Sequence, residues 1–529
     1  MGHSPPVRNL VNDFTGHLGN EMLLVLGRPG SGCTTFLKSL ANKRGEYVDV
    51  LGDVSYGGLT PKEVEKKYRG EVVYNGEDDI HYPTMTVGET LSFALRQKVP
   101  RMRPAGMRRS EFVEFVLDAL LKMFGIEHTR DTIVGDEMHR GISGGERKRV
   151  SIAETLITRA SVMCWDNSTR GLDASTAVDY VRSLRIITDV TGGTSIATLY
   201  QAGEGIYELF DKVCLIDEGR CIYFGPANEA CAYFESLGYY KPPRQTSADF
   251  LTGLTDVHER TFREGFENKA PRTPEELEAA YRSSHYYQQA CQQADQSFSE
   301  DHSQLTDFKT SVRQEKKKRM AKSSPYTVSY FEQIYYCFIR QLQILWGNRD
   351  GFQTKLGTIF VVSFVVSSLF YGEEQSDAGA FSRGGILFFS ILFIGWLQLP
   401  ELFDAVSGRT IIQRQREFAF YRPSAVVFAR VLSDIPVLLI CVSLMSIIVY
   451  FLSSLRYTAG QFFIYYLFVF ITALNLTSFY RAVASLSPTF NEAIRFSVCA
   501  LNIAVIFVGY VIPRTNMPQH FKVCLKLII

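Results

Sequence analysis

The sequence lacks an excess of charge of one sign, cysteine pairs at metal-binding or redox spacing, and a signal peptide. Its 56 lysines and arginines and 55 acidic residues give a formal charge of +1, which does not suggest a nucleic-acid partner. The ten cysteines form no CxxC pair, so neither a zinc site nor a redox motif is expected. Residues 1 to 20 contain no apolar core, so later segments must direct any membrane insertion.

Long apolar runs are missing from the first two thirds of the chain and frequent after about Arg349. Each of five such runs approaches the roughly 20 residues that a helix needs to cross a bilayer. They are residues 352–371, 384–402, 431–452, 462–480 and 493–511. We therefore expect three parts: a soluble domain over 1–254, a linker over 255–330, and a transmembrane domain over 331–529 that starts with an amphipathic connecting helix.

The loops between the apolar runs predict the orientation. The segment "RTIIQRQREFAFYRPSAVVFAR" after the second run is basic, whereas "GEEQSDAGAFSR" after the first is acidic. Basic loops favour the cytosolic side. We expect a multi-pass membrane protein whose soluble domain and basic loop lie in the cytosol.

The soluble domain has the pattern of an α/β fold with a mainly parallel sheet. The run "EMLLVL" (Glu21 to Leu26) predicts a buried strand, and a glycine-rich turn and a helical pattern follow it. Further apolar runs at 161–165, 192–200 and 211–216 alternate with helix-like segments.

The stretch "LGRPGSGCTTF" has the spacing of a phosphate-binding P-loop, but Cys33 stands where such loops carry lysine. Glycines let backbone amides approach phosphates, and a hydroxyl at the start of the helix binds magnesium. We expect Thr34 and Asp166 at the metal. The predicted ATP-binding residues are Gly27, Arg28, Pro29, Gly30, Ser31, Gly32, Cys33, Thr34 and Thr35.

A second glycine-rich helix start lies in "GISGGERKRVSIAETLI", where Ser143, Gly144, Gly145 and Glu146 begin a predicted helix. An apolar strand ending at Asp166 follows, and then "RGLDAST" with Asp173. This order closely resembles the signature motif, Walker B strand and D-loop of an ATP-binding cassette.

The stretches "LGRPGSGCTTFLK", "YNGEDDIHYPTMTVGETLSF" and "GISGGERKRVSIAE" resemble the amino-terminal half of fungal pleiotropic drug resistance transporters, the G-type branch of the ABC family. The resemblance implies an α/β P-loop ATP-binding cassette followed by an all-α transmembrane helix bundle. It also implies ATP and Mg²⁺ as cofactors, a plasma-membrane location, and export of hydrophobic small molecules such as drugs, xenobiotics or lipids. Members of this family have two cassettes and two six-helix membrane domains, so the chain is expected to be a fragment or a short product.

Four positions at which the family places catalytic groups are altered here, namely Cys33, Asn167, Tyr200 and Glu77. They replace, in order, the P-loop lysine, the catalytic glutamate, the switch histidine and the Q-loop glutamine. An amide at Asn167 cannot accept a proton from water, which forfeits roughly 10²- to 10⁴-fold in rate. Each change alone could be drift, but together they predict a site that binds magnesium nucleotide and does not turn it over.

The signature motif is intact, and in this family it completes the nucleotide site of a facing cassette. The expected partners are a second cassette and membrane domain, in the same longer chain or another subunit, together with the bilayer and a hydrophobic substrate. The alternative is a truncated, membrane-anchored nucleotide-binding protein without transport of its own, regulatory or relic.

In the membrane domain the resemblance points to a substrate path lined by Phe388, Phe389, Phe393, Asn502 and Phe507. On periodicity alone these residues would be lipid-facing or packing residues. Arg414, Arg416 and Glu417 lie where related transporters rest a short helix on the cassette, although charges on such a loop are usually just solvated.

Overall fold

The structure is a computed structural model that describes residues 7–199, 202–299, 302–317, 320–321, 323–372, 377–507 and 510. It divides into two compact units. The amino-terminal unit comprises Met1–Gln333 and Gln415–Arg422, and the helical unit comprises Ile334–Arg414 and Pro423–Ile529. A short segment, residues 415–422, thus returns to the first unit between two parts of the second.

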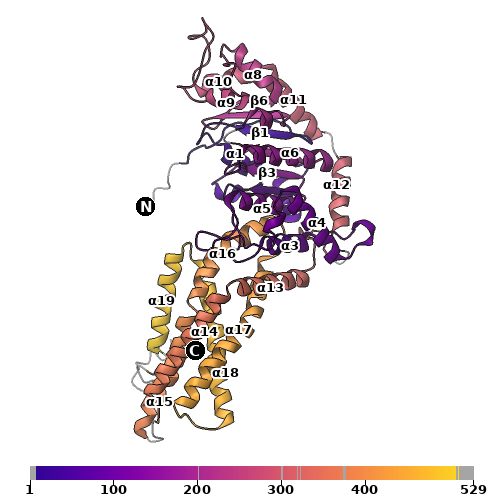
Figure 1. Ribbon diagram of the computed structural model, residues 1–529. Helices are drawn as coiled ribbons and strands as arrows, with labels where there is room; N and C mark the ends of the chain where they lie inside the picture. Colours follow the sequence, from indigo (N-terminus) through magenta and orange to yellow (C-terminus); the bar gives the residue numbers. More distant parts are fainter. Residues whose placement is uncertain are drawn as a thin grey trace. The chain divides into compact units, whose positions relative to one another are not determined.

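The amino-terminal unit contains one six-stranded sheet with helices against it, drawn in indigo to magenta in Figure 1. The strand order is β2-β3-β4-β1-β5-β6, and all neighbours are parallel except β5 and β6. This confirms the predicted α/β fold. The strands are β1 (Met22–Leu26), β2 (Val72–Asn75), β3 (Val162–Asp166), β4 (Thr194–Thr198), β5 (Lys212–Asp217) and β6 (Arg220–Pro226).

The central strands form because nearly all of their residues are buried in the interior of the unit, and most of these residues are apolar. All five residues of β1 are buried, as expected of a strand covered on both faces. The apolar runs in the sequence predicted β1, β3, β4 and β5, whereas β2 and β6 were not predicted.

The helices of this unit begin at caps that the sequence supplies. Thr60, Thr86, Ser143 and Thr273 each form a capping box with a glutamate three residues later. The helices are α1 (Cys33–Leu40), α2 (Pro61–Lys67), α3 (Val87–Lys98), α4 (Arg109–Met123), α5 (Gly144–Leu156), α6 (Ala174–Thr191), α7 (Glu204–Tyr207), α8 (Ala227–Ser236), α9 (Ser247–Gly253), α10 (Pro274–Ser283), α11 (His285–Ser299) and α12 (His302–Glu315).

Residues 255–330 contribute helices to the amino-terminal unit. Helices α10 and α11 pack on β6, and the predicted cap Thr273 accepts a hydrogen bond from the amide of Glu276 at 3.2 Å. Leu305 and Phe308 of α12 pack beside the small cluster of Leu59, Val64 and Val72. The segment expected to be a linker is therefore largely folded against the sheet and its flanking helices.

The helical unit consists of long apolar helices. Among the described residues, four candidate membrane spans occur, at Arg349–Leu369, Gly379–Glu417, Pro423–Leu452 and Ala459–Leu486. The fifth predicted segment overlaps α19, and the rest of it, apart from residue 510, lies outside the described residues, so that span stays a prediction. The helices are α13 (Tyr330–Gly347, shared with the first unit), α14 (Arg349–Leu369), α15 (Asp377–Leu397), α16 (Pro400–Glu417), α17 (Pro423–Leu452), α18 (Ala459–Leu486) and α19 (Phe490–Phe507).

One expectation about this unit was wrong. The basic segment after the second apolar run, residues 409–430, was predicted as a loop, but its first part through Glu417 continues α16 and its last part from Pro423 begins α17. The segment is rich in Arg, Gln and Ile and has no glycine or proline between Arg409 and Glu417, so nothing local ends the helix there.

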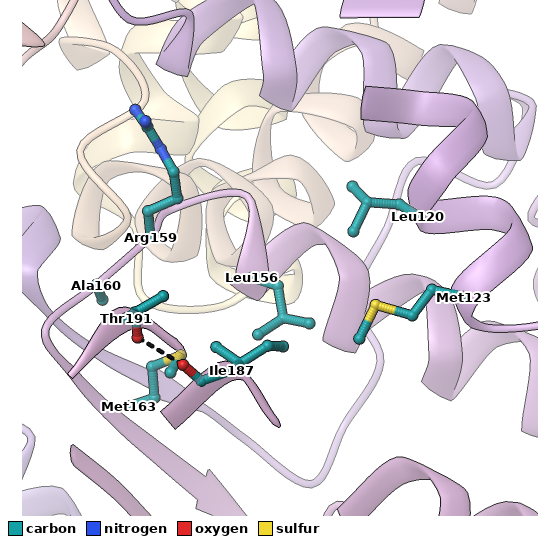
Figure 2. Close-up of a pocket in the computed structure, with 8 residues that line it drawn as sticks. All are labelled: Leu120, Met123, Leu156, Arg159, Ala160, Met163, Ile187 and Thr191. Carbon is teal, nitrogen blue, oxygen red and sulfur yellow. Dashed lines mark hydrogen bonds between the residues drawn. The ribbon is translucent and has the colours of Figure 1, made fainter. Parts of the chain in front are cut away.

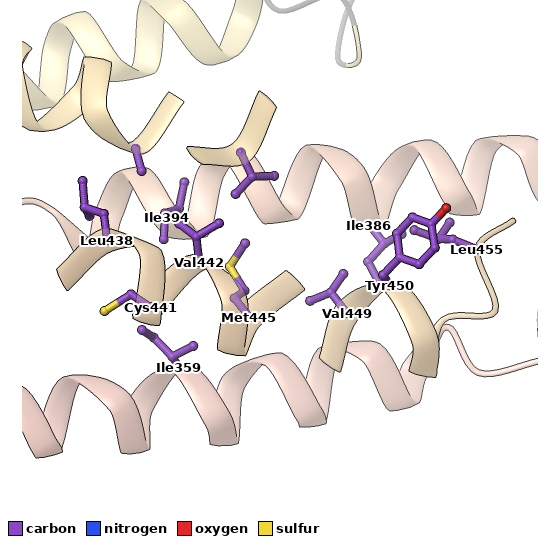
Figure 3. Close-up of a cluster of buried hydrophobic side chains, with 12 residues drawn as sticks. Ile359, Ile386, Ile394, Leu438, Cys441, Val442, Met445, Val449, Tyr450 and Leu455 are labelled. Atoms are coloured by element: carbon purple, nitrogen blue, oxygen red, sulfur yellow. The ribbon is translucent and has the colours of Figure 1, made fainter. Parts of the chain in front are cut away.

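The helical unit is held by an apolar cluster and a partly buried group of ion pairs. Figure 3 shows Ile359 of α14, Ile386 and Ile394 of α15, and a row of α17 side chains packed together. Arg481 of α18 contacts Glu401 of α16 at 2.6 Å and Asp434 of α17 at 3.0 Å. Charges inside a membrane bundle are costly unless they are paired in this way.

Candidate nucleotide-binding site

The P-loop connects β1 to α1 and has room only for glycine at its first position. A Cβ on Gly27 would lie 2.4 Å from Ser31 Oγ and 2.5 Å from the carbonyl oxygen of Ile216. Gly30 and Gly32 have φ of 86° and 105°, which favours glycine. No side chain caps α1 at Gly32, so the positive end of this eight-residue helix is left for an anion. The loop therefore fits a phosphate group.

Cys33 brings no positive charge to this loop. Its Sγ lies 3.5 Å from Ser31 Oγ, and burial raises the pKa of the thiol to about 11. The side chain therefore remains a neutral thiol near pH 7, and it cannot replace the missing lysine.

Asp166, at the end of β3, is held by three hydroxyl groups. Oδ1 accepts hydrogen bonds from Thr34 at 3.1 Å and Thr198 at 2.6 Å, and Oδ2 accepts one from Tyr74 at 2.6 Å. A carboxylate has about four acceptor sites, so one stays open for a metal-bound water. Thr34 and Asp166, the predicted metal pair, therefore lie together, and their oxygens suit magnesium.

Asn167 lies at the position expected for the catalytic base, and its backbone is left-handed, with φ of 47°. Asparagine tolerates this conformation better than most residues. Its Nδ2 donates to Glu77 Oε1 at 3.3 Å, and its Oδ1 is buried without a hydrogen-bond partner. The structure thus brings Asn167 and Glu77 together, as expected for two positions of one site.

Glu77 also forms an ion pair with Arg170, which was not among the predicted site residues. The Glu77 carboxylate is therefore already bound to the guanidinium group of Arg170. Tyr200, the fourth altered position, lies outside the described residues.

Arg28 of the P-loop is held by acidic groups of the turn between β5 and β6. Its guanidinium lies 2.7 Å from Glu218 and 3.8 Å from Asp217. Burial raises the pKa of the Asp217 carboxyl to about 6, although Arg28 and Arg260 oppose the shift. In this structure Arg28 therefore ties the P-loop to the turn between β5 and β6.

The sequence missed two further contacts of the metal pair, Tyr74 and Thr198. Neither belongs to a glycine-rich motif; they meet Asp166 because β2, β3 and β4 are adjacent in the sheet. The ring of Tyr74 lies 4.4 Å from Lys43 Nζ, and Lys43 forms an ion pair with Glu417 at 2.7 Å. A chain of contacts therefore leads from Asp166 to the returning segment 415–422.

A second contact joins this segment to the amino-terminal unit. Gln415 donates to Glu154 Oε1 of α5 at 2.9 Å and accepts a hydrogen bond from the Tyr421 hydroxyl at 2.7 Å. Of the basic-loop charges singled out, Glu417 thus has a specific contact within this unit.

The signature residues form a well-capped helix start. Ser143 Oγ accepts a hydrogen bond from the Glu146 amide at 3.3 Å, and Glu146 Oε2 accepts one from the Ser143 amide at 2.8 Å. A Cβ on Gly144 would meet no atom within 4 Å, so this face of the turn is open. A Cβ on Gly145 would lie 3.5 Å from the carbonyl of Gly171, which places the signature beside the D-loop.

Asp173 of the D-loop caps α6. It accepts hydrogen bonds from the Ser175 hydroxyl at 2.6 Å and the Thr176 amide at 3.2 Å. These bonds lower the pKa of its carboxyl, so the side chain stays ionised.

An apolar pocket of about 240 Å³ in the same unit is separate from these residues. Figure 2 shows Leu120, Met123 and Leu156 facing Met163 and Ile187 across it. None of the predicted nucleotide residues lines it. Its two polar side chains are already engaged: the Thr191 hydroxyl donates to the carbonyl of Ile187, and Arg159 donates to the carbonyl of Lys98 and to Glu315.

The predicted path residues of the helical unit lie on two helices. Phe389 and Phe393 of α15 stack at 5.6 Å, and Phe388 stacks on Tyr510 at 4.9 Å. Asn502 of α19 is exposed within the unit. Phe507 ends α19, and its side chain is outside the described part.

Comparisons with known proteins agree with this architecture. Residues 15–170 match the family model described as ABC transporter, and residues 332–528 match the model described as ABC-2 type transporter. The solved structure of cbiO1 from Clostridium perfringens, part of the ABC transporter complex cbiONQ, covers 41% of this chain and 82% of its own at 23% identity, with a TM-score of 0.33. That likeness is too slight to add to the assignment.

Curated relatives cover almost the whole chain. ABC multidrug transporter atrF of Aspergillus fumigatus is 53% identical over 98% of this chain and 33% of the relative. ABC transporter G family member 9 of Dictyostelium discoideum is 42% identical over 97% of this chain and 36% of the relative. The chain thus spans about a third of the length of these relatives. It belongs to the G-type ABC transporters, with an ATP-binding cassette followed by an ABC-2 type membrane domain.

Proposed function

We propose that the chain provides the non-hydrolysing half of an asymmetric pair of cassettes in an ATP-driven exporter. Its own P-loop binds magnesium nucleotide without turnover, and its signature helix completes the hydrolytic site of a second cassette. That cassette carries the lysine and glutamate that are absent here, and lies in the same longer chain or in another subunit.

One observation carries the proposal: the site keeps its phosphate cradle and metal pair but has no proton acceptor at Asn167. The glycine loop and the start of α1 would hold the phosphates, and Thr34 and Asp166 would hold magnesium. Bound magnesium would supply positive charge to the phosphate oxygens. Asn167 can orient a water by its amide but cannot take its proton, and Glu77 is held by Arg170.

The signature turn supports the other half of the proposal. Its cap is complete and its first glycine is open, so α5 can present backbone amides and its positive end to a phosphate from another cassette. A pair of two copies of this chain would join two altered loops to two good signatures, and should turn over little or no ATP.

The proposal about which compounds are transported rests on the relatives alone. Those named multidrug transporters support the proposal that the complete assembly exports hydrophobic small molecules across the plasma membrane, with the cassette in the cytosol. Phe388, Phe389, Phe393, Asn502 and Phe507 are the proposed path. Their aromatic rings suit hydrophobic compounds, and Asn502 adds one polar contact.

The test uses membranes that contain the full chain. An azido-ATP analogue should label it in the presence of Mg²⁺, and no phosphate should be released. A cassette of this branch with an intact P-loop and a disabled signature is then added, and phosphate release should appear. Release should disappear again when this chain carries Ser143→Arg, which blocks the open turn.

Two outcomes would overturn the proposal. Phosphate release by the chain alone would contradict a non-hydrolysing site. Nucleotide binding without any stimulation of the second cassette would favour the alternative, a membrane-anchored nucleotide-binding protein. Restoring Cys33→Lys and Asn167→Glu together should not create turnover in the isolated chain, because the proposal also requires a partner cassette and a full membrane domain, and robust turnover by that double variant alone would contradict it.

A further inference from the structure

The helical unit contains a cavity of about 660 Å³ among the start of α15, the end of α17 and the start of α18. From its lining residues we infer a binding site for one phospholipid of the outer leaflet, with the phosphate at two arginines and an acyl chain along α15 and α18. This inference does not depend on the proposed nucleotide chemistry.

The polar residues of the cavity share one end. Arg383 lies near the start of α15, Gln461 near the start of α18, and Arg456 in the turn that joins α17 to α18. Arg383 is the last residue of the acidic segment "GEEQSDAGAFSR", which the sequence predicts to lie outside the cell. Arginine presents a planar fork that matches phosphate oxygens, and it holds its charge at any physiological pH.

The lining becomes apolar with depth. On α15, Arg383 is followed on the same helical face by Leu387 and Ile391, four and eight residues along. On α18, Gln461 is followed by Ile464, and then by Phe468. Both helices begin at the polar end and pack on each other. Eight helical residues span about 12 Å, so the apolar part can hold a substantial length of acyl chain.

The tyrosine hydroxyls at the cavity are used for structure. Tyr450 donates to the carbonyl of Arg456 at 2.6 Å, which fixes the turn that carries this arginine. Tyr465 donates to Ser390 Oγ at 2.9 Å. Tyr450 and Leu455 belong to the packed cluster of Figure 3, beside Ile386. The other polar side chains of the lining are Arg383, Arg456 and Gln461.

This pattern distinguishes a phospholipid from an uncharged hydrophobic compound. An uncharged compound would use the apolar wall but gain little from two guanidinium groups, whereas a soluble anion would use the arginines but leave the wall empty. Long cationic side chains at the ends of membrane helices extend toward the headgroup region, which is where a lipid phosphate lies.

The test compares two photoactivatable lipids with the same acyl chains, a phosphatidic acid and a diacylglycerol, on the full chain in a maltoside detergent. The phosphatidic acid should label peptides from 383–391 or 456–468 about tenfold more than the diacylglycerol, or ~1.4 kcal/mol. The double variant Arg383→Gln/Arg456→Gln should remove this preference. Arg495→Gln, an exposed arginine of α19, is the matched control and should change nothing.

Equal labelling by the two lipids, or a preference that survives in the folded double variant, would overturn the inference. Loss of labelling in millimolar inorganic phosphate would also overturn it, because the site would then take a soluble anion. If the double variant does not fold, Arg456→Lys keeps the charge and loses the fork. It should reduce the preference only in part, and an unchanged preference would count against the site.

Discussion

Helices α1 and α5 both begin at glycine-rich turns of the amino-terminal unit, yet their caps differ. Helix α1 starts at Gly32 without a side-chain cap, whereas α5 starts at Ser143 with a full capping box. The first turn has Cys33 in place of the lysine, and its site has Asn167 in place of the proton acceptor, whereas the second turn keeps every residue of its motif. Under the proposed function, this difference implies that phosphate binding depends on the backbone, and that turnover depends on a few side chains that can change without disturbing the backbone.

The largest expected effect comes from Asp166→Asn. The NH₂ group of the new asparagine would face a hydroxyl group that now donates to Asp166. Two donors cannot bond each other through the same hydrogen position, so a buried polar group would lose its partner at a cost of about 3 kcal/mol. We expect ~100-fold weaker binding of magnesium nucleotide, measured by titration of a fluorescent ATP analogue. Asp118→Asn, an exposed residue paired with Arg130, should leave binding unchanged; a loss there would indicate general damage.

Cys33→Lys should tighten nucleotide binding by about tenfold. A positive charge near the phosphates contributes up to ~4 kcal/mol at an effective dielectric near 20, and the cost of burying the lysine ammonium group offsets part of this gain. The same titration measures it. Cys33→Ser keeps the site neutral and should give no gain. An equal gain from serine and lysine would mean that shape, not charge, limits binding at the P-loop.

Ser143→Ala should cost about 1 kcal/mol of cap stability and lower the turnover of a second cassette severalfold, with no effect on nucleotide binding by this chain. Thr273→Ala removes a similar capping box from α10 and is the matched control. Thermal unfolding should respond to both variants, and phosphate release only to Ser143→Ala. If Thr273→Ala also lowers release, the effect of the signature serine is structural.

The smallest expected effect is that of Tyr74→Phe. Asp166 keeps two other hydroxyl donors, so we expect a loss of only about 0.5 kcal/mol in stability. The freed lone pair of Oδ2 should raise the apparent affinity for Mg²⁺ about twofold, measured by Mg²⁺ titration of nucleotide binding. Tyr207→Phe removes a buried hydroxyl bonded to the carbonyl of Ala227, and it should leave the Mg²⁺ dependence unchanged.

Much of the fold was predictable because its signals are local. Buried strands appear as apolar runs, glycines mark the turns that need positive φ, and a threonine or serine with a glutamate three residues later marks a helix start. The P-loop, the signature and the pairing of Thr34 with Asp166 followed from these patterns. The helical continuation of α16 was missed because basic residues were read as a loop.

The sequence by itself determined the order of the two domains, the glycine loop and the absence of lysine at Cys33, since each is written in consecutive residues. Only the tertiary structure decided which distant side chains surround Asp166 and Glu77. Tyr74, Thr198 and Arg170 meet them through the adjacency of parallel strands and the turns that follow them, and no local period records which strands become neighbours. The return of residues 415–422 to the amino-terminal unit depends in the same way on contacts between segments far apart in the chain.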